Sequence, residues 1–384
     1  MKKRVYLDNV FTPIDTRALQ EMINYYGKEF MNPSSIHREG VHAKKALEEA
    51  RKGVASYLHA HSDEIIFTSG GTESNGLALE GAGRAARRGG IAKPHLIVSS
   101  IEHSSVMKVA EMMERHGVEV TRLPVDSSGV VSLSELKKSL KPSTYLVSII
   151  SVNNETGAIQ PVREVAKIIR HFRKTHTSRH NPDTYPLFHT DAALALYEDV
   201  NVERLGVDLL TLDGSKVYGP RGIGALYVRR NSPIEQIIYG GGQERGLRSG
   251  TENVPAIAGF AKALEIAEKK KEKESARMTE LRTYFTKGLK SIRGGITVNG
   301  EGSPQIVNVT IPDIDNEFFI LQLDAKGVSS STKSSCLRDE DESYVLKAMG
   351  KDSRTSVRFA LGRETTMKDL DYVLKTIDRI LSSR

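Results

Sequence analysis

Short, nearly all-apolar runs alternate along the chain with longer segments in which apolar residues recur every three or four positions. The first pattern is typical of strands buried on both faces, and the second of helices that cover a sheet. The expected strands are 5–7, 64–68, 95–99, 118–123, 145–152, 186–192, 207–212 and 224–228. The expected helices are one capped by residues 32–37, then 77–86, 106–116, 132–140 and 162–172. This alternation predicts an α/β fold with a mostly parallel sheet covered on both faces.

The C-terminal part of the chain has a different pattern. A long helix is expected from residue 254 to about 292, and the elements after it are strand 305–311, helix 316–325, a polar loop, helix 344–349, strand 356–360 and helix 367–381. At 384 residues the chain is long enough for two domains. We therefore expect a large domain over residues 15–254. A smaller α+β domain is expected from residues 1–14 and 255–384.

Composition and charge describe an ordinary soluble globular protein, with 39% hydrophobic and 27% charged residues. The net charge of +7 is spread out, and its densest runs, 269–273 and 171–180, resemble a solvated helix face and a surface loop. Direct nucleic-acid binding is therefore not expected, although the charge could attract an anionic cofactor or an acidic protein. No apolar run could span a bilayer, and the N-terminus lacks the apolar core of a signal peptide, so we expect no membrane contact and a cytoplasmic location.

Cys336 is the one cysteine of the chain. A disulfide within the chain and a cysteine-based metal site are both excluded, and no metal site is expected. The neighbours of Cys336 are polar throughout and include Lys333 and Arg338. A cysteine in such surroundings is not a core residue, and nearby cations favour its thiolate. We expect a reactive thiol on a mobile loop.

Lys216 stands in a glycine-rich turn between the apolar runs 207–212 and 224–228. An amine held between buried strands loses part of its hydration, which makes it a usable nucleophile for Schiff-base chemistry. The alternative is an exposed lysine on a glycine-rich hairpin. This turn alone does not decide between the two.

A second turn, residues 69–76, joins an expected strand to an expected helix and contains Gly71 and Thr72. A strand–turn–helix of this composition points free backbone N–H groups at an anion. It is neither a P-loop nor a dinucleotide-binding fingerprint, and a plain connecting turn is the alternative. Polar residues also follow the ends of other expected strands: Thr72, His103, Asn154, Asp191 and Lys216. In a parallel sheet such residues converge on one edge, where ligands bind.

A Schiff-base lysine, a buried carboxylate and an anion-binding turn together suit pyridoxal 5'-phosphate (PLP). Lys216, Asp191 and the Gly71–Thr72 turn fit these three roles. His103 is placed for stacking on the cofactor ring or for proton transfer, and the alternative is a core histidine satisfied by hydrogen bonds.

An ordered set of segments resembles the cysteine desulfurases of the NifS/IscS type, within the class V aminotransferase-like, fold-type-I PLP enzymes. The matching segments are 32–37 (NPSSIH), 67–74 (FTSGGTES), 102–103 (EH), 152–157 (VNNETG), 189–192 (HTDA), 216–224 (KVYGPRGIG), 240–251 (GGGQERGLRSGT) and 357–363 (VRFALGR). They run nearly end to end. The resemblance implies a three-layer αβα large domain with a smaller α+β C-terminal domain.

The resemblance also implies roles at the cofactor. Lys216 would form the Schiff base, Asp191 would partner the pyridine nitrogen, and His103 would stack on the ring. The remaining cofactor contacts implied are Gly71, Thr72, Asn154, Ser215 and Thr251. Thr251 would reach the phosphate across the interface of a homodimer.

For the substrate L-cysteine, the resemblance implies contacts with Asn154, Asn32 and Arg358, the last holding the carboxylate. Cys336 would attack the substrate sulfur, keep it as a persulfide and release L-alanine. The sulfur would pass to an acceptor protein in iron–sulfur cluster assembly or tRNA thiolation. Two other readings stay open: another PLP-dependent lyase or transaminase, or a weakened homologue that serves as a sulfur-acceptor or binding scaffold.

Four positions depart from the family pattern. Ser215 stands where the family has a phosphate-binding histidine, Asp213 where it has serine, and Leu194 where it has glutamine near the ring hydroxyl. The N-terminal loop 8–13 is one residue shorter than in the family. An anion at position 213 repels a phosphate unless it points away or pairs with a cation. Weaker cofactor retention or altered substrate handling is the expected consequence.

Overall fold

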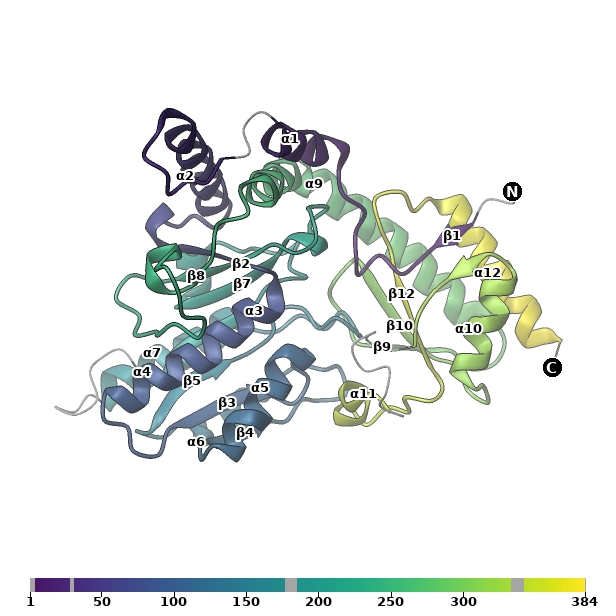
Figure 1. The fold of residues 1–384 in the computed structure, drawn as a ribbon. Coiled ribbons are helices and arrows are strands. Elements are labelled where there is room, and N and C mark those ends of the chain that lie inside the picture. The colour runs from purple at the N-terminus through teal and green to yellow at the C-terminus, as the bar shows by residue number, and fades with distance from the viewer. Residues whose placement is uncertain (1–3, 28–30, 177–184, 333–341, 384) are drawn as a thin grey trace.

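The computed structural model describes residues 4–27, 31–176, 185–332 and 342–383. These residues form a large unit around a seven-stranded sheet and a smaller unit around a three-stranded sheet (Figure 1). One long helix, α9 (Val254–Ser291), runs from the large unit to the small one. The predicted α/β fold with a smaller C-terminal α+β unit is confirmed.

The large sheet has the strand order β2-β8-β7-β6-β5-β3-β4. Its strands are β2 (Ile65–Thr68), β3 (His95–Ser99), β4 (Glu119–Leu123), β5 (Thr144–Ser148), β6 (Leu187–Asp191), β7 (Leu209–Asp213) and β8 (Gly224–Val228). Of these seven strands, β8 is antiparallel to both neighbours, while β7, β6, β5, β3 and β4 pair in parallel. The carboxyl ends of six strands therefore lie at one edge, the edge at which open α/β sheets bind ligands.

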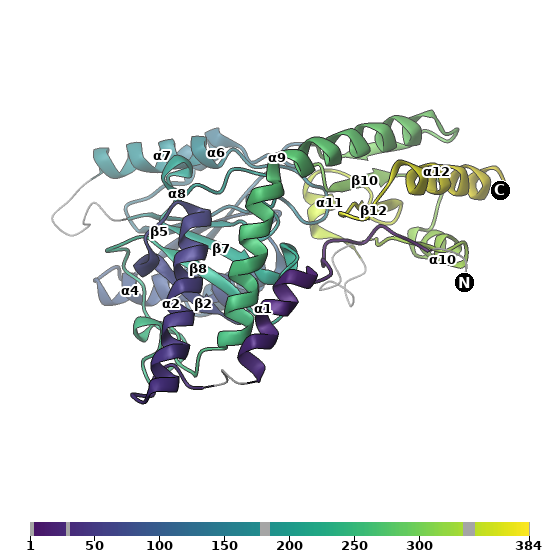
Figure 2. The ribbon, with the colours of Figure 1, turned by 90° about the horizontal axis from the view of Figure 1, so that it is seen from above.

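Helices cover both faces of this sheet. The helices on one face are α2 (Arg38–Leu58), α6 (Leu133–Ser139), α7 (Val162–Thr175) and the first half of α9, and those on the other are α3 (Gly71–Gly76), α4 (Ala82–Arg88) and α5 (Ser104–Arg115). Phe67 packs with the first group and its neighbour Ile66 with the second, as the two-residue period of a strand requires. Figure 2 shows α2 and α9 over the β2–β8–β7 side of the sheet. These are the three layers that the sequence predicts.

The helix after β2 starts earlier than the sequence pattern indicates. It begins at Gly71 and not at residue 77, and it continues through a π-helical turn, Leu77–Gly81, into α4. A Cβ at Gly81 would lie 2.5 Å from the backbone oxygen of Glu235. A glycine is therefore needed at this point, where the chain around Glu235 packs against the helical run. The polar residues 72–76 consequently lie on a helix and not in a loop.

The small unit contains a three-stranded antiparallel sheet in the order β12 (Ser356–Ala360), β10 (Ile306–Thr310) and β9 (Thr297–Asn299). Its core is closed by α10 (Asn316–Ala325), α12 (Met367–Ser382) and the second half of α9. At the start of the chain, β1 (Val5–Tyr6) pairs in parallel with β11 (Val328–Ser329). The domain limits at 14/15 and 254/255 remain a prediction, because α9 packs against both cores.

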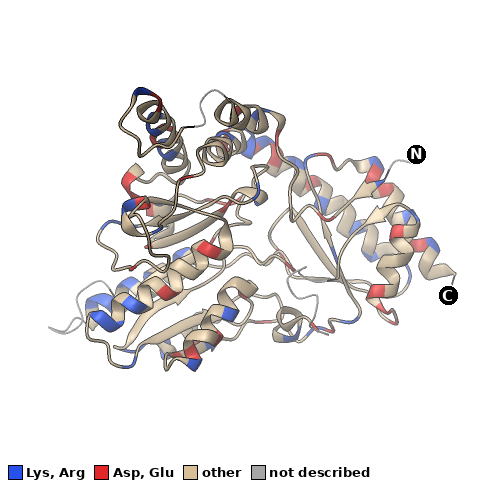
Figure 3. Cartoon of the chain, in the orientation of Figure 1, with Lys and Arg blue, Asp and Glu red and all other residues tan. Residues whose placement is uncertain are grey.

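Remaining short elements connect these layers. They are α1 (Thr16–Tyr26), which packs on α9, α8 (Val202–Leu205) and α11 (Tyr344–Ala348). Lys and Arg as well as Asp and Glu lie on the helices of both units (Figure 3). Within the four described ranges, no helix combines the length and the apolar character needed to cross a membrane.

Candidate active site

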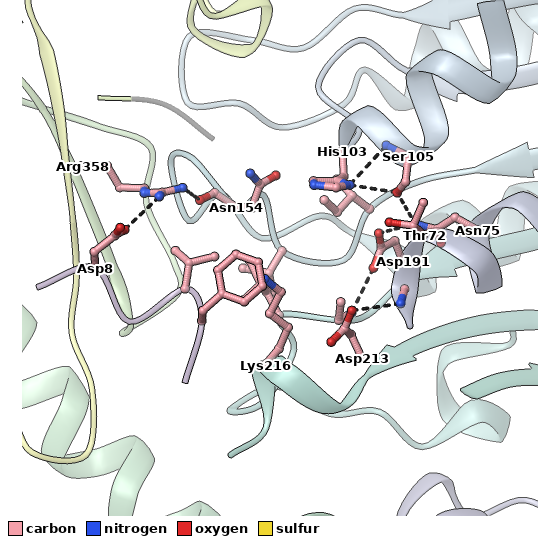
Figure 4. A pocket seen from close by; sticks show the side chains of 17 residues that line it. Asp8, Thr72, Asn75, His103, Ser105, Asn154, Asp191, Asp213, Lys216 and Arg358 are labelled. Atoms are coloured by element: carbon pink, nitrogen blue, oxygen red, sulfur yellow. Dashed lines mark hydrogen bonds and ion pairs between the residues drawn. The ribbon is translucent and has the colours of Figure 1, made fainter. Parts of the chain in front are cut away.

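A pocket of about 210 Å³ lies at the carboxyl edge of the large sheet, next to β12 and the N-terminal segment. All five polar residues that the sequence predicts to converge line it: Thr72, His103, Asn154, Asp191 and Lys216. Gly71 and Arg358 line it as well. Figure 4 shows Arg358 at one end, His103 and Asp191 at the other, and Lys216 between them. The predicted convergence is therefore found, while the roles of these residues remain predictions.

Gly224 brings the two predicted turns together. In the sheet it lies opposite Thr68, which precedes the turn at Gly70, and opposite Asp213, which precedes the lysine turn. A Cβ at Gly224 would lie 2.8 Å from the Cα of Gly70, so only glycine permits this approach. Gly70 itself has a φ of +146°, a conformation that residues with side chains rarely adopt. Lys216 and the Gly71–Thr72 turn therefore face the same pocket.

Lys216 is confined by the N-terminal segment. Its Nζ atom lies 3.4 Å from the ring centroid of Phe11, a cation–π contact. The Thr12 hydroxyl donates to the backbone oxygen of Ser215 at 3.0 Å and accepts from the N–H of Tyr218 at 2.8 Å. These bonds fasten the shortened loop to the lysine turn. This contact could not be predicted from the sequence, because residues 11 and 216 meet only in the folded chain.

Asp191, at the end of β6, is held by a chain of hydrogen bonds. The Asn75 amide donates to its Oδ2 at 2.7 Å and also to the Ser105 hydroxyl at 2.8 Å. Ser105 in turn contacts Nδ1 of His103 at 2.8 Å, and its backbone N–H donates to the same nitrogen at 3.2 Å. Asp191 is 5% exposed, and this network fixes the direction of its carboxylate.

The hydrogen bonds also set the tautomer of His103. Because the Ser105 N–H donates to Nδ1, this nitrogen is an acceptor, and the proton of the neutral ring is assigned to Nε2. His103 is the N-cap of α5, which fixes its backbone at the rim of the pocket. The ring is thus presented to the pocket with one orientation and one protonated nitrogen.

Sequence reasoning missed Asn75. It lies three positions after Thr72, and on the helix that begins at Gly71 this spacing places both residues on one face. The expected helix start at residue 77 concealed that relation. A helix start read at the glycine pair would have pointed to Asn75.

At the other end of the pocket, Arg358 from β12 is held by three partners. It donates to Asp8 Oδ1 at 3.0 Å, to the backbone oxygen of Asn154 at 2.9 Å and to the Ser331 hydroxyl at 3.0 Å. Arg358 is 2% exposed, so the guanidinium is fixed in place. A fixed guanidinium beside a pocket suits recognition of a carboxylate, although Asp8 already takes one of its donors.

Glu102, directly before His103, is fully buried. Burial raises the pKa of its carboxyl group to about 8, although hydrogen bonds from the Ser99 hydroxyl and the Ile150 N–H act in the opposite direction. The carboxyl is therefore protonated at neutral pH in the folded chain but ionised in the unfolded chain. The unfolded state then binds fewer protons, so this group lowers stability as the pH rises from about 4.5 to about 8.

Glu102→Gln keeps the shape and the acceptor oxygen but cannot ionise. We expect the variant to gain stability relative to the parent protein by at least about 2 kcal/mol more at pH 8 than at pH 5. Urea unfolding at the two pH values measures this difference. An equal difference at both pH values would contradict the buried, protonated carboxyl.

Several predicted site residues lie elsewhere. Asn32 and Thr251 are exposed, and neither lines the pocket. Ser215 is buried and its hydroxyl donates to Asp213 at 2.6 Å. Cys336 lies outside the described residues. The structure thus brings Lys216, Asp191 and His103 together in one pocket. The roles predicted for Asn32, Thr251, Ser215 and Cys336 remain predictions.

The segment that carries Thr251 is nevertheless attached to the pocket wall. Arg248 forms an ion pair with Glu73, the neighbour of Thr72, at 2.8 Å. Earlier in the same segment, Glu244 pairs with buried Arg51 of α2 at 2.7 Å. The glycine-rich segment 240–251 is therefore fixed beside the Gly71–Thr72 turn.

Comparison with known proteins shows the family to which the chain belongs. The family model described as "Aminotransferase class-V" matches residues 5–373. The chain belongs to this family. A curated relative from Dictyoglomus turgidum, "Cysteine desulfurase IscS", is 41% identical over 99% of this chain and 95% of its own length. "Cysteine desulfurase, mitosomal" from Encephalitozoon cuniculi is 40% identical over 100% of this chain and 88% of its own length.

Solved structures give the same placement. The structure titled "NIFS-LIKE PROTEIN" superposes with a TM-score of 0.89 at 35% identity and covers 99% of this chain and 100% of its own. "SspA in complex with cysteine" has a TM-score of 0.78 at 32% identity, with 94% of this chain and 99% of its own covered. Within the class-V aminotransferase family, the chain groups with the NifS/IscS-type cysteine desulfurases.

The cofactor of this family is PLP, and the pocket can be tested against it residue by residue. At the ring end, a buried carboxylate (Asp191), a histidine of fixed orientation (His103) and a lysine (Lys216) face one space, and they fit. At the phosphate end, the N–H of Gly71 donates to the carboxylate of Asp213 at 2.9 Å. The ring and amine contacts therefore suit PLP, whereas the phosphate turn already holds an anion of the chain itself.

Proposed function

We propose that this protein is a PLP-dependent cysteine desulfurase that converts L-cysteine to L-alanine and keeps the sulfur as a persulfide on Cys336. The observation that carries the proposal is the convergence of Lys216, Asp191 and His103 in one pocket, with Arg358 at its far end. Full-length similarity to proteins named cysteine desulfurase supports it. Purified protein supplied with PLP and L-cysteine should release alanine and sulfide, and absence of both products would refute the proposal.

Bound PLP would supply an electron acceptor for the carbon that carries the substrate amine. The residues of the chain set up that chemistry. Asp191, oriented by Asn75, can hold a proton on the pyridine nitrogen, which an ionised carboxylate favours. The amine of Lys216 can bind the cofactor aldehyde and then move protons at the substrate Cα. His103, whose Nε2 carries the proton of the neutral ring, is the histidine among the described residues that line the pocket, and it is suited to proton transfer or to stacking.

The transfer of sulfur from L-cysteine to Cys336 needs no external oxidant. The thiolate of Cys336 attacks the sulfur of L-cysteine, so that an S–S bond forms on the protein. The C–S bond of the substrate breaks, and its electron pair stays with the carbon, which takes up a proton to give alanine. The protein sulfur is oxidised to the persulfide level as the carbon is reduced. The flanking Lys333 and Arg338 favour the thiolate.

Arg358 is proposed to hold the carboxylate of L-cysteine. Arg358→Ala should lower kcat/KM about 100-fold, mainly through KM, because a charge-assisted contact to the substrate is lost. Steady-state kinetics of alanine release measures this. Asp8→Asn is the matched control, because it keeps an acceptor oxygen but removes the carboxylate charge that competes for Arg358, and it should lower KM or leave it unchanged. An unchanged KM in Arg358→Ala would place the substrate carboxylate elsewhere.

A homodimer is also proposed. Large apolar side chains are exposed on α1, around the start of α2 and on the segment that follows β8: Leu19, Ile23, Tyr26, Ile36, Val41, Ile238 and Tyr239. Exposed apolar side chains favour association. Thr251, exposed on the segment beside the pocket, would then reach the phosphate of a partner's cofactor, and Asn32 would approach a partner's substrate.

The sulfur acceptor is proposed to be a protein of iron–sulfur cluster assembly or tRNA thiolation, in a cytoplasmic setting. A lyase or transaminase acting on another amino acid is the second candidate. The observation that favours it is Leu194 in the pocket wall, where the family has glutamine. A substrate screen separates the two, because turnover that does not need Cys336 would support the second. A weakened scaffold homologue would stay colourless with PLP.

A further inference from the structure

The carboxylate of Asp213 occupies the turn in which a cofactor phosphate would be expected. Its Oδ2 accepts the N–H of Gly71 at 2.9 Å, the first N–H of the helical run that continues to Arg88. The same oxygen lies 3.2 Å from the position that a Cβ on Gly71 would take. A backbone N–H at the start of a helix is the donor that phosphates use in other proteins. Here the chain supplies the anion.

The second oxygen of Asp213 is fixed by Ser215. Oδ1 accepts the backbone N–H of Ser215 at 2.8 Å and its hydroxyl at 2.6 Å. The three groups that contact the carboxylate are all donors, so it is held in a direction that faces Gly71. Asp213 and Ser215, the two residues that depart from the family pattern, are thus hydrogen-bonded to each other. The hydroxyl at position 215 is turned to Asp213, so neither side chain offers the phosphate a donor.

The charge of the pocket wall adds to this effect. Its acidic residues are Asp8, Asp191 and Asp213, and its basic residues are Lys216 and Arg358. The guanidinium of Arg358 pairs with Asp8 at the far end. A phosphate ester carries close to two negative charges at neutral pH, so placing it beside Asp213 adds a like-charge repulsion. An uncharged hydroxymethyl group could instead donate a hydrogen bond to the same carboxylate.

We propose that Asp213 is a specificity-determining residue that competes with the cofactor phosphate for the Gly71 turn. The chain consequently discriminates less in favour of PLP over unphosphorylated pyridoxal than an Asp213→Ser variant does. The inference rests on the proposed PLP cofactor. Entry of the phosphate requires the carboxylate to leave Gly71, so Asp213 sets how firmly the cofactor is retained.

The test is a titration of cofactor-free protein with PLP and, separately, with pyridoxal. The visible absorbance of the lysine-bound aldehyde reports binding. In Asp213→Ser the Kd for PLP should fall at least about tenfold, whereas the Kd for pyridoxal should change less than about threefold. Comparing variants cancels the different solution chemistry of the two aldehydes. High salt should raise the PLP preference of the parent protein, because it screens the repulsion.

Asp213→Asn guards against a folding defect, since it keeps the shape and an acceptor oxygen and removes the charge. It should show most of the gain in PLP affinity. Ser215→Ala is the matched control, because it removes one donor to Asp213 and leaves the charge in place. It should not increase PLP affinity as the charge-removing variants do.

Two outcomes contradict the inference, and they are distinguishable from failure of the proposed function. If Asp213→Ser and Asp213→Asn bind PLP no more tightly than the parent, and the parent releases alanine, Asp213 does not compete and the function stands. Weaker PLP binding in both variants would mean that Asp213 helps to hold the cofactor. Absence of the visible band in every protein with either aldehyde would refute the cofactor and the inference together.

Discussion

Lys216→Ala is expected to lose the visible absorbance of bound PLP and to release alanine from L-cysteine at least about 1000-fold more slowly than the parent protein. The reason is the position of the lysine: its amine lies between the Asp191 end and the Arg358 end of the pocket, 3.4 Å from the Phe11 ring centroid. No other lysine lines this pocket in the described chain. Absorbance after reconstitution and quantification of alanine measure the two losses.

Lys216→Arg is the matched control for the charge. It keeps a cation against Phe11 but offers no amine that condenses with an aldehyde. It should therefore fail like Lys216→Ala, while its melting temperature should stay closer to that of the parent. Turnover within about tenfold of the parent in either variant would show that the lysine is not the nucleophile.

Cys336→Ser is expected to lower sulfide release from L-cysteine at least about 100-fold while leaving PLP binding and its absorbance unchanged. A hydroxyl at this position does not form a persulfide. Because Cys336 is the one cysteine of the chain, the variant contains no thiol at all, and the assay has no competing protein sulfur. Thiol labelling of the parent checks that one reactive group is present.

The same variant separates the proposed reactions. Turnover of another amino acid by Cys336→Ser would favour a lyase or transaminase. Unchanged desulfuration of L-cysteine in Cys336→Ser would mean that a small thiol in solution accepts the sulfur. Loss of desulfuration with retention of the absorbance band would support the proposed function.

The fold was largely predictable because its strands are short and buried on both faces. Runs such as 95–99 and 224–228 are mostly apolar and coincide with β3 and β8. The polar ends of these strands are also local features, which is why the convergence of His103, Asn154 and Asp191 could be inferred from a parallel sheet. Apolar periodicity did not locate the start of α3, which begins at Gly71, because its residues 72–76 are mostly polar.

The contacts that tune the site could not be predicted, because they join segments far apart in the chain. Phe11 meets Lys216, and Asn75 meets Asp191, only after the sheet has formed. The sequence indicates that an anion at Asp213 would repel a phosphate, but it does not indicate which way the carboxylate points. Whether the carboxylate would face the phosphate turn depended on the pairing of Gly224 with both neighbouring strands.

The most direct measurement of the proposed function is a single turnover. Protein reconstituted with PLP is mixed with a slight excess of L-cysteine in the absence of reductant, and alanine and the mass of the Cys336 peptide are determined together. The proposed function predicts close to one alanine for each active site and one added sulfur atom on Cys336. Alanine without sulfur on Cys336, or no alanine from protein that shows the visible band, would contradict it.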